Sequence, residues 1–187
     1  MFWKRKPKPD RAKVGESNES GPKSLNDAAL SAVLTGDEGE LRALIQRGAD
    51  VNHVHDLGRS LLHLAVCYAP PLVEPLLNAG ARPDAADANG FTALHFAAQQ
   101  RELESAKALL KAGATVDVQN RYGNTPLGVA TFYCGNAEGE VIKLLLAAGA
   151  DRNLRNASGV SPYQLACTIA NYDVKRWYEG VGDGGKQ

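Results

Sequence analysis

The densest group of potential metal ligands in the sequence is the segment HVHD at residues 53–56. His53 and His55 are two positions apart, so in an extended segment both imidazoles point to the same side, and Asp56 adds a carboxylate. Two imidazoles and one carboxylate could begin a zinc site. No further ligand stands at a matching spacing, so we interpret them as polar hairpin residues and expect neither a metal nor another cofactor.

Nucleophilic and phosphate-binding chemistry has little support in the sequence. Cys67, Cys134 and Cys167 lie inside helix-like phrases, and no His or acidic residue accompanies them at a fixed offset to act as a base. The segment GDGGK at 182–186 is faintly like a phosphate loop, but no strand-like segment precedes it and no helical segment follows. We therefore expect a protein that is not an enzyme.

One phrase recurs along the chain. The segment NGFTALHFAA at 89–98 returns in part as SLLHLA, TPLGVA and SPYQLA, and RGADVN at 47–52 returns as AGARPD, AGATVD and AGADRN. The interval from the glycine of the second phrase to the Ser or Thr of the first is always twelve residues, as from Gly48 to Ser60. The rest of the unit varies from 20 to 24 residues. A constant span is typical of stacked hairpins that must stay in register, whereas a loop between helices can lengthen.

The third copy of the phrase indicates how one unit folds. Gly90 supplies the positive φ of a tight turn, and Thr92 provides a hydroxyl N-cap for a short apolar helix. A second helix should follow, with apolar residues at the spacing of one buried face: Leu103, Ala106, Leu109 and Leu110. Gly113 is expected to end that helix in a left-handed cap.

This order of turn, helix, helix and extended arm, with TALH and TPLG standing for T-P-L-H, resembles the ankyrin repeat. The resemblance implies an all-α repeat solenoid of helix–turn–helix units joined by β-hairpin-like loops. The repeat domain should cover residues 24–178, in five units: 24–53, 54–85, 86–118, 119–154 and 155–178. In this family the histidine of the phrase ties neighbouring turns together by hydrogen bonds, so His63 and His95 are expected to be structural.

Three units should depart from the common pattern. Pro70, Pro71 and Pro75 predict a short second helix in the second unit, beginning near Leu72 with Pro75 in its first turn. The fourth unit carries three extra residues in CGNAEGE at 134–140, which predicts a bulging loop between its helices. The fifth unit should have only a short second helix, at about 173–177.

The two ends of the chain differ from the repeats in composition. Residues 1–23 are expected to be a disordered basic tail, because they hold six basic residues and one acidic residue in the first thirteen and few large apolar groups. Residues 179–187 are expected to be a flexible C-terminal tail. A basic run can bind nucleic acid or an anionic membrane, but without a folded basic patch it more often solubilises, so both partners are disfavoured.

The remaining composition indicates the cellular compartment. Acidic and basic residues balance at 21 each, and the three cysteines form no CxxC pair. The basic leader has no apolar stretch typical of a secretory signal, and no apolar run is long enough to span a bilayer. Reduced thiols and these absences lead us to expect a cytoplasmic protein.

The repeat scaffold leaves certain positions free to bind a partner. In such a stack the hairpin tips and the first helices line one concave face, and residues beside the tip glycines or near the ends of the first helices carry no duty in the scaffold. Phe91 is expected to be an exposed fingertip, and Phe132 is as compatible with local packing as with exposure. The candidate partner-binding residues are Leu57, Arg59, Tyr68, Asn89, Phe91, Gln99, Gln100, Arg121, Tyr122, Asn124, Phe132 and Tyr133.

Two functional hypotheses follow from these patterns. The first is a non-enzymatic module that binds one protein through its concave face, as an inhibitor, a toxin-neutralising (immunity) protein or an adaptor. The alternative is a tethered regulator whose basic tail docks on nucleic acid or an anionic membrane while the repeats hold a protein. The identity of the partner does not follow from the sequence, because surface residues of a repeat scaffold carry no transferable code.

Overall fold

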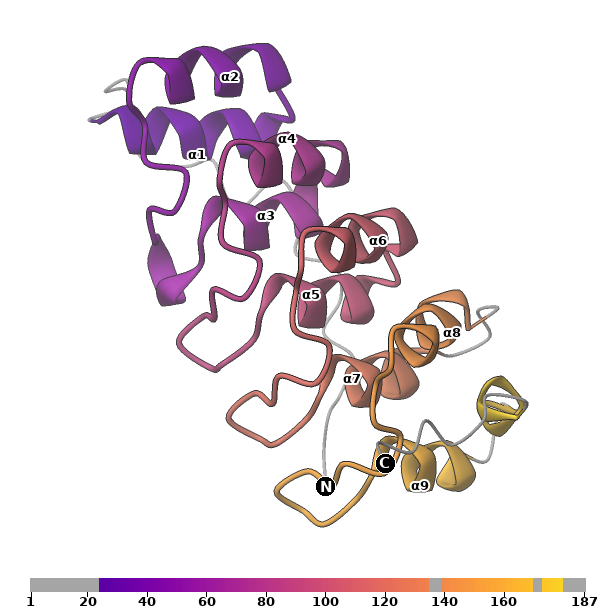
Figure 1. The fold of residues 1–187 in the computed structure, drawn as a ribbon. Helices are drawn as coiled ribbons and strands as arrows, with labels where there is room; N and C mark the ends of the chain where they lie inside the picture. Colours follow the sequence, from indigo (N-terminus) through magenta and orange to yellow (C-terminus); the bar gives the residue numbers. More distant parts are fainter. Residues whose placement is uncertain (1–23, 135–138, 170–172, 180–187) are drawn as a thin grey trace.

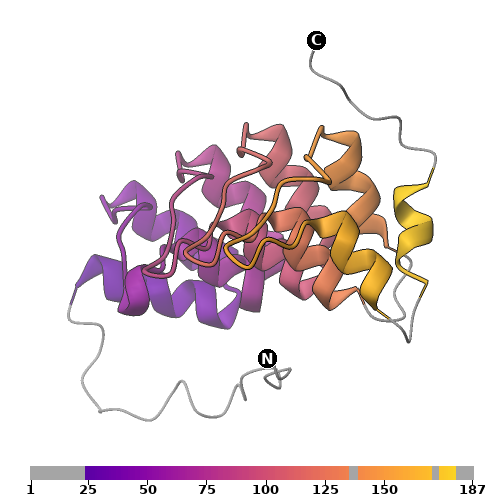
Figure 2. The same cartoon turned by 90° about the horizontal axis from the view of Figure 1, so that it is seen from below.

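The computed structural model describes residues 24–134, 139–169 and 173–179, which form a row of stacked helix pairs (Figure 1). The first helices of the pairs are α1 (Leu25–Thr35), α3 (Leu61–Tyr68), α5 (Ala93–Gln100), α7 (Pro126–Tyr133) and α9 (Pro162–Thr168). The second helices are α2 (Glu38–Gln46), α4 (Val73–Asn78), α6 (Leu103–Lys111) and α8 (Glu140–Ala147), and they form a second layer (Figure 2). A 3-10 turn, η4 (Lys175–Tyr178), takes the place of a second helix in the last pair.

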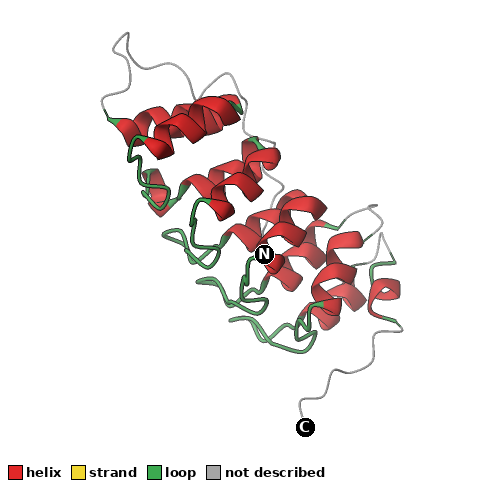
Figure 3. Ribbon diagram, turned by 45° about the horizontal axis from the view of Figure 1, so that its top comes forward, coloured by secondary structure: helices red, strands yellow, loops and turns green. Residues whose placement is uncertain are grey.

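The fold is the all-α repeat solenoid that the recurring phrases predict. Within residues 24–134, 139–169 and 173–179 there is no extended strand, and two isolated antiparallel bridges pair Val54 with Ser60 and Ala86 with Thr92. These bridges close hairpin-like loops, which project from one side of the helices in a row (Figure 3).

Hydroxyl residues begin the first helices, as the phrase predicts. Oγ1 of Thr125 accepts a hydrogen bond from the amide of Gly128 at 3.2 Å. The amide of Thr92 donates to Nδ1 of His95 at 3.1 Å, so the histidine completes a reciprocal cap in α5. These bonds satisfy amides that have no partner within the first turn of a helix.

Small residues allow the first helices to pack closely. Ala97 and Ala98 of α5 are fully buried, as are Ala65 of α3 and Leu127 of α7. Helix α5 contacts α3 on one side and α7 on the other. A single helix pair would leave its apolar face in water, so the core exists only because the pairs stack.

The prolines of the second unit shorten its second helix, as predicted. Pro70 begins a 3-10 turn, η3 (Pro70–Leu72), and α4 has 6 residues where α6 has 9. Pro75 lies in the first turn of α4, where its missing N–H removes no helical hydrogen bond.

The last unit forms only a 3-10 turn where a short second helix was expected at 173–177. Tyr178 of this turn is 1% exposed, and its hydroxyl is hydrogen-bonded to Oγ1 of Thr131. Trp177 packs against the core, with the ammonium of Lys143 4.2 Å from its ring centroid. Two large aromatic side chains thus cover the end of the core without a full helix.

Several sequence predictions concern residues outside the described part of the chain. The basic tail at 1–23, residues 180–187 with their GDGGK segment, and most of the predicted bulge at 134–140 lie there. The domain limits therefore stay a prediction. None of the helices in residues 24–134, 139–169 and 173–179 is long and apolar enough to cross a membrane.

Candidate functional site

Four hairpins at residues 54–60, 86–92, 119–125 and 155–161 stand in a row beside the first helices (Figure 1). Together with the C-terminal ends of α3, α5 and α7 they form the surface that we call the hairpin face. All twelve candidate partner-binding residues lie on these elements.

Backbone hydrogen bonds join the tip of each hairpin to the next. The amide donates to the carbonyl oxygen in three such bonds: Ala88 to Leu57 (2.8 Å), Arg121 to Asn89 (3.0 Å) and Ala157 to Tyr122 (3.0 Å). The approach is close, because a Cβ built on Gly123 would lie 2.5 Å from the backbone nitrogen of Ala157. The constant twelve-residue span therefore encodes a ladder of hairpins in fixed register.

A second set of bonds closes the last three hairpins from within. Oδ1 of Asp87 accepts the amides of Asn89 (2.8 Å) and Phe91 (2.9 Å). Asn120 and Asn156 occupy the same position and each accept two amides in the same way. These residues are not among the candidates predicted from the sequence, although an Asp or Asn three positions before each of these tip glycines is a visible signal.

His63 and His95 join neighbouring units, as the resemblance implies. Nε2 of His63 lies 3.0 Å from the carbonyl oxygen of Phe91, and Nε2 of His95 lies 2.9 Å from that of Asn124. Because each Nδ1 accepts the amide of the N-cap residue, the neutral ring carries its proton on Nε2 and donates it to the carbonyl. Burial lowers the pKa of both rings, that of His95 to about 4, so both are neutral at pH 7.

The first hairpin departs from this pattern, because His55 stands where the others carry Asp or Asn. An imidazole nitrogen has one lone pair and cannot accept both amides as a carboxylate oxygen does. Leu57 has a φ of 61°, in the left-handed region that costs a residue with a side chain about 1–2 kcal/mol. The ring of His55 meets that of His53 edge to face at 4.9 Å, and burial, followed by the charge on His53, lowers the pKa of His55.

The exposed large apolar side chains in residues 24–134, 139–169 and 173–179 all lie on hairpins. Val54 is 57% exposed, Leu57 62% and Tyr122 45%. Leu57 and Tyr122 are tip residues, and the tip that carries Asn89 stands between them in the ladder. Single exposed apolar residues are common, and here the three stand on two of the hairpins where the sequence predicts contacts with a partner.

Phe91 is not the exposed fingertip that its place after the tip glycine suggests. It is half-buried and packs against the core, with its ring centroid 5.4 Å from that of His95 and 5.7 Å from that of Phe96. The residue after the tip glycine faces the first helix, so an aromatic side chain there enters the core. Asn124 at the equivalent place also has a structural role, since its Oδ1 accepts a hydrogen bond from Nδ2 of Asn156 at 2.8 Å.

Other candidate residues interact with one another across the hairpin face. The guanidinium of Arg121 donates to Oδ1 of Asn89 and lies 5.6 Å from the ring centroid of Tyr122. Nε2 of Gln99 donates to the hydroxyl of Tyr133 at 3.3 Å, which links the ends of α5 and α7. These contacts fix the orientation of polar groups on the surface before any partner binds.

The remaining candidates lie near the ends of the first helices. Tyr68 and Phe132 are half-buried, and the ring of Phe132 meets that of Tyr133 edge to face at 5.1 Å. Gln100 is hydrogen-bonded to the thiol of Cys67. Phe132 does not belong to the aromatic residues that pack against the buried core, whereas Tyr133 does.

Arg59 connects the first two hairpins. Its guanidinium lies over the ring of Phe96, 4.9 Å from the centroid, and its Nε is 3.8 Å from Oδ2 of Asp87. The side chain of Arg59 is 30% exposed and that of Asp87 only 2%.

The groups with potential for chemistry do not assemble into a reactive site in the described part of the chain. No three His, Cys, Asp or Glu side chains in residues 24–134, 139–169 and 173–179 are placed to hold a metal ion. None of the three cysteines forms a disulfide, and burial raises the pKa of Cys67 to about 11 and that of Cys134 above its ordinary value. Neutral thiols of this kind are poor nucleophiles.

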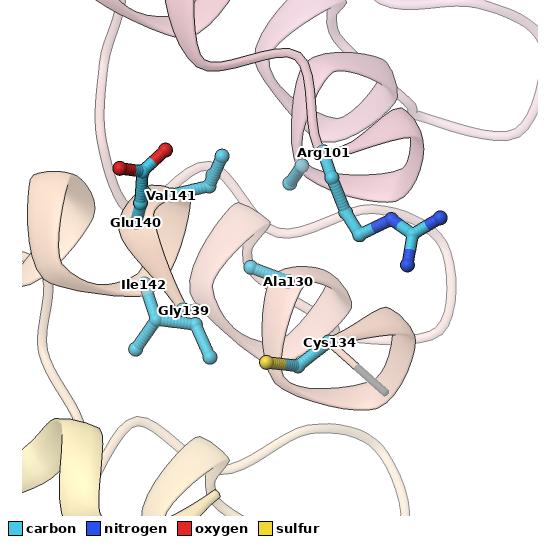
Figure 4. Close-up of a pocket in the computed structure, with 8 residues that line it drawn as sticks. Arg101, Ala130, Cys134, Gly139, Glu140, Val141 and Ile142 are labelled. Carbon is cyan, nitrogen blue, oxygen red and sulfur yellow. The ribbon is translucent and has the colours of Figure 1, made fainter. Parts of the chain in front are cut away.

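A small cavity of about 70 Å³ lies between the end of α5 and the start of α8 (Figure 4). Arg101, Cys134 and Glu140 contribute to its lining together with small and apolar residues. Its volume accommodates a few water molecules, which is well below the size of a ligand pocket.

Comparison with known proteins supports the same architecture. The family model described as Ankyrin repeats (3 copies) matches residues 25–120 and 62–156. The chain is 33% identical to a putative ankyrin repeat protein of fowlpox virus over 142 residues, and 34% identical to human B-cell lymphoma 3 protein over 148 residues. These matches cover 72% and 76% of the chain but only 41% and 32% of the two relatives. Human cyclin-dependent kinase 4 inhibitor B is 31% identical over 118 residues, which are 62% of the chain and 86% of the inhibitor.

Proposed function

Because the chain belongs to the ankyrin-repeat family, whose repeats mediate protein–protein interactions and are generally not enzymes, we propose that it binds one protein partner through its hairpin face. The observation that carries this proposal is the placement of Val54, Leu57 and Tyr122. These exposed apolar side chains stand on hairpins that backbone hydrogen bonds hold in fixed order, so the surface is organised before a partner arrives. A preorganised surface loses little conformational entropy on binding.

The partner-binding residues that we propose are ten of the twelve candidates, all except Phe91 and Asn124, with Leu57 and Tyr122 as the main apolar anchors. Tyr and Arg are enriched among binding hot spots, which favours Tyr122 and its neighbour Arg121, while Leu57 adds exposed apolar area. A stable complex on this surface should bury about 1,600 Å² in total. Phe91 and Asn124 would contribute indirectly, because their side chains hold the hairpins in place and do not face the partner.

We further propose an inhibitor, toxin-neutralising or adaptor role in the cytoplasm. Similarity to cyclin-dependent kinase 4 inhibitor B supports the inhibitor hypothesis, since the region similar to this chain makes up 86% of that protein. An array of this size can act by occupying one surface of its partner. The free thiols of all three cysteines agree with a reducing compartment.

Affinity purification from the native source tests the proposal when wild type is compared with the double variant Leu57→Ala/Tyr122→Ala. The double variant should lose most of the captured partner, while circular dichroism and melting temperature stay close to wild type because both side chains are exposed. Glu104→Ala/Lys107→Ala is a matched control, since it removes two exposed side chains from α6, away from the hairpins. Loss of the partner with the α6 variant alone would place the binding surface elsewhere.

A further inference from the structure

Arg59 occupies a position that its counterparts use for local packing. It stands one residue after the tip glycine, where the other hairpins carry Phe91, Asn124 and Val160. Phe91 enters the core and Asn124 bonds to Asn156, so both are used within the scaffold. Arg59 therefore places a cation on the hairpin face, at the position directly after the tip glycine.

The surroundings of Arg59 hold its guanidinium in one orientation. Its Cζ atom lies over the ring of Phe96, 4.9 Å from the centroid. Oδ2 of Asp87 lies 3.8 Å from Nε, which is too long for a hydrogen bond but close enough to attract the charge. Packing on an aromatic ring with an anion at one edge reduces the freedom of a side chain that is otherwise highly flexible.

The hydrogen-bonding capacity of this guanidinium is largely unused. Nε is buried without a hydrogen-bond partner, and no residue within 24–134, 139–169 and 173–179 accepts a hydrogen bond from either Nη. The side chain is nevertheless 30% exposed, so part of the group is open to solvent. A guanidinium has five N–H donors in a planar fork that matches the two oxygens of a carboxylate.

Within the described residues, Asp87 is the acidic side chain that forms an ion pair with Arg59. The other titratable neighbours are His63 and Cys67, both of which the charge on Arg59 influences. Burial lowers the pKa of His63 and raises the pKa of Cys67 to about 11, so both are neutral at pH 7. Oδ1 of Asp87 is already engaged with the amides of Asn89 and Phe91, which leaves Oδ2 alone to face the cation.

We infer that Arg59 is a specificity-determining residue of the hairpin face, which binds the carboxylate of an Asp or Glu side chain on the protein partner. This inference rests on the proposed function, because it assigns a chemistry to one position of that surface. The carboxylate would accept hydrogen bonds from the two Nη groups of Arg59. The ring of Phe96 would stay against the guanidinium and support it. The partner segment that meets the first two hairpins is then acidic, next to the apolar groups that meet Leu57 and Tyr122.

A purely structural role for Arg59 would be to neutralise buried Asp87, and the chain itself offers a variant that separates the two roles. Asn120 and Asn156 hold the position of Asp87 in the next two hairpins and accept the same two amides. Asp87→Asn should therefore keep the hairpin closed and remove only the negative charge. If Arg59 serves a partner carboxylate, this variant frees the guanidinium, and binding should be as tight as in wild type or tighter.

The test uses short peptides selected from a random displayed library on the full-length protein, with dissociation constants measured for wild type, Arg59→Gln, Arg59→Lys and Asp87→Asn. The selected peptides should contain an Asp or Glu whose change to Asn or Gln weakens binding about tenfold or more. Arg59→Gln should cause the same loss, and the two changes together no further loss, because they remove one interaction. Arg59→Lys should recover only part of the affinity, and Asp87→Asn should bind as tightly as wild type or tighter.

Three results would overturn this role of Arg59. They are selection of peptides without an acidic residue, equal affinity of wild type and Arg59→Gln, and weaker binding by Asp87→Asn with an intact fold. Leu57→Ala/Tyr122→Ala distinguishes the two proposals. If this double variant loses the peptides while Arg59→Gln retains them, the hairpin face stands and the carboxylate site does not. If Arg59→Gln no longer binds the peptides while the double variant still binds them, the assignment of Leu57 and Tyr122 as apolar anchors is wrong.

Discussion

His95 lies between two units, with Nδ1 3.1 Å from the amide of Thr92 in its own unit and Nε2 2.9 Å from the carbonyl oxygen of Asn124 in the next. One imidazole thus caps a helix and fixes the following hairpin. The first bond requires the neutral ring, since a protonated ring has no acceptor at Nδ1, and the second uses the proton that the neutral ring carries on Nε2. Stability should therefore depend on pH through this residue.

We predict that the protein loses stability on acidification between pH 6.5 and about 4. Burial holds the pKa of His95 at about 4 in the folded state, against 6.5 for an unperturbed histidine, so the unfolded chain takes up a proton first as the pH falls. The contribution is complete above pH 6.5 and declines by about 3 kcal/mol as the pH reaches 4. Urea unfolding at a series of pH values across this window measures it.

His95→Gln provides the control, because unit five already carries Gln164 at this place. Oε1 of Gln164 accepts the amide of Ser161 at 3.1 Å, so a glutamine can keep the cap without titrating. The variant should lose stability less steeply than wild type on acidification, and His63 and His55, whose pKa values burial also lowers, contribute to the remaining slope. An unchanged slope would show that His95 does not titrate as predicted.

We predict that Gly128→His stabilises the junction between the last two units. Gly128 holds the position of His95 in α7, and a Cβ there would make ordinary contacts with Oγ1 of Thr125 at 3.7 Å and Cγ of Pro162 at 3.8 Å. An imidazole could reach the carbonyl of Val160, as His95 reaches that of Asn124. The free energy of unfolding should rise by about 2 kcal/mol, of which about 1 comes from replacing a helical glycine.

Gly128→Ala separates the two contributions, because alanine removes the flexible glycine but adds no hydrogen bond. Urea unfolding should show a gain of about 1 kcal/mol for alanine and a larger gain for histidine. Equal gains would mean that no bridge forms.

We predict that alanine at Gly123 destabilises the protein more than alanine at Gly159. The two glycines have φ values of 72° and 76°, so the conformational strain on a side chain is the same, about 1–2 kcal/mol. At Gly123 the new Cβ also lies 2.5 Å from the nitrogen of Ala157, whereas at Gly159 nothing lies within 4 Å. The difference in unfolding free energy between the variants measures the contact between hairpins, and we expect it to exceed about 1 kcal/mol.

We predict that Leu57→Asn raises stability and weakens partner binding. Asparagine adopts the left-handed region with less strain than leucine, so the unfolding free energy should increase by up to about 1 kcal/mol. The exposed apolar anchor is lost at the same time. Tyr122→Asn is the matched control, since Tyr122 is not among the residues with positive φ and the substitution should weaken binding without a gain in stability. A gain of the same size at both sites would contradict the assignment of strain to Leu57.

The fold could be read from the sequence because it depends on local rules that each copy repeats. Gly90 and Thr92 specify a turn and a cap whatever surrounds them, and the constant spacing between phrases fixes how copies stack. The prolines of the second unit likewise act within their own helix. The last unit was less predictable, because the 3-10 turn that contains Tyr178 depends on the contact with Thr131 in another unit.

The candidate site could be placed on the correct elements, but the direction of single side chains could not. Phe91 and Tyr122 both flank a tip glycine, yet one follows it and faces the helix while the other precedes it and faces solvent. That difference depends on the geometry of the turn. The pairing of Arg59 with Asp87 joins two hairpins and has no signal within either phrase.

The three backbone hydrogen bonds that join one hairpin tip to the next are accepted by the carbonyl oxygens of Leu57, Asn89 and Tyr122. Since the side chains of these residues take no part in those bonds, exchanging them should leave the order of the hairpins unchanged. Substitutions at the tips can therefore change which target is recognised, while the row of hairpins that presents the tip residues keeps its order.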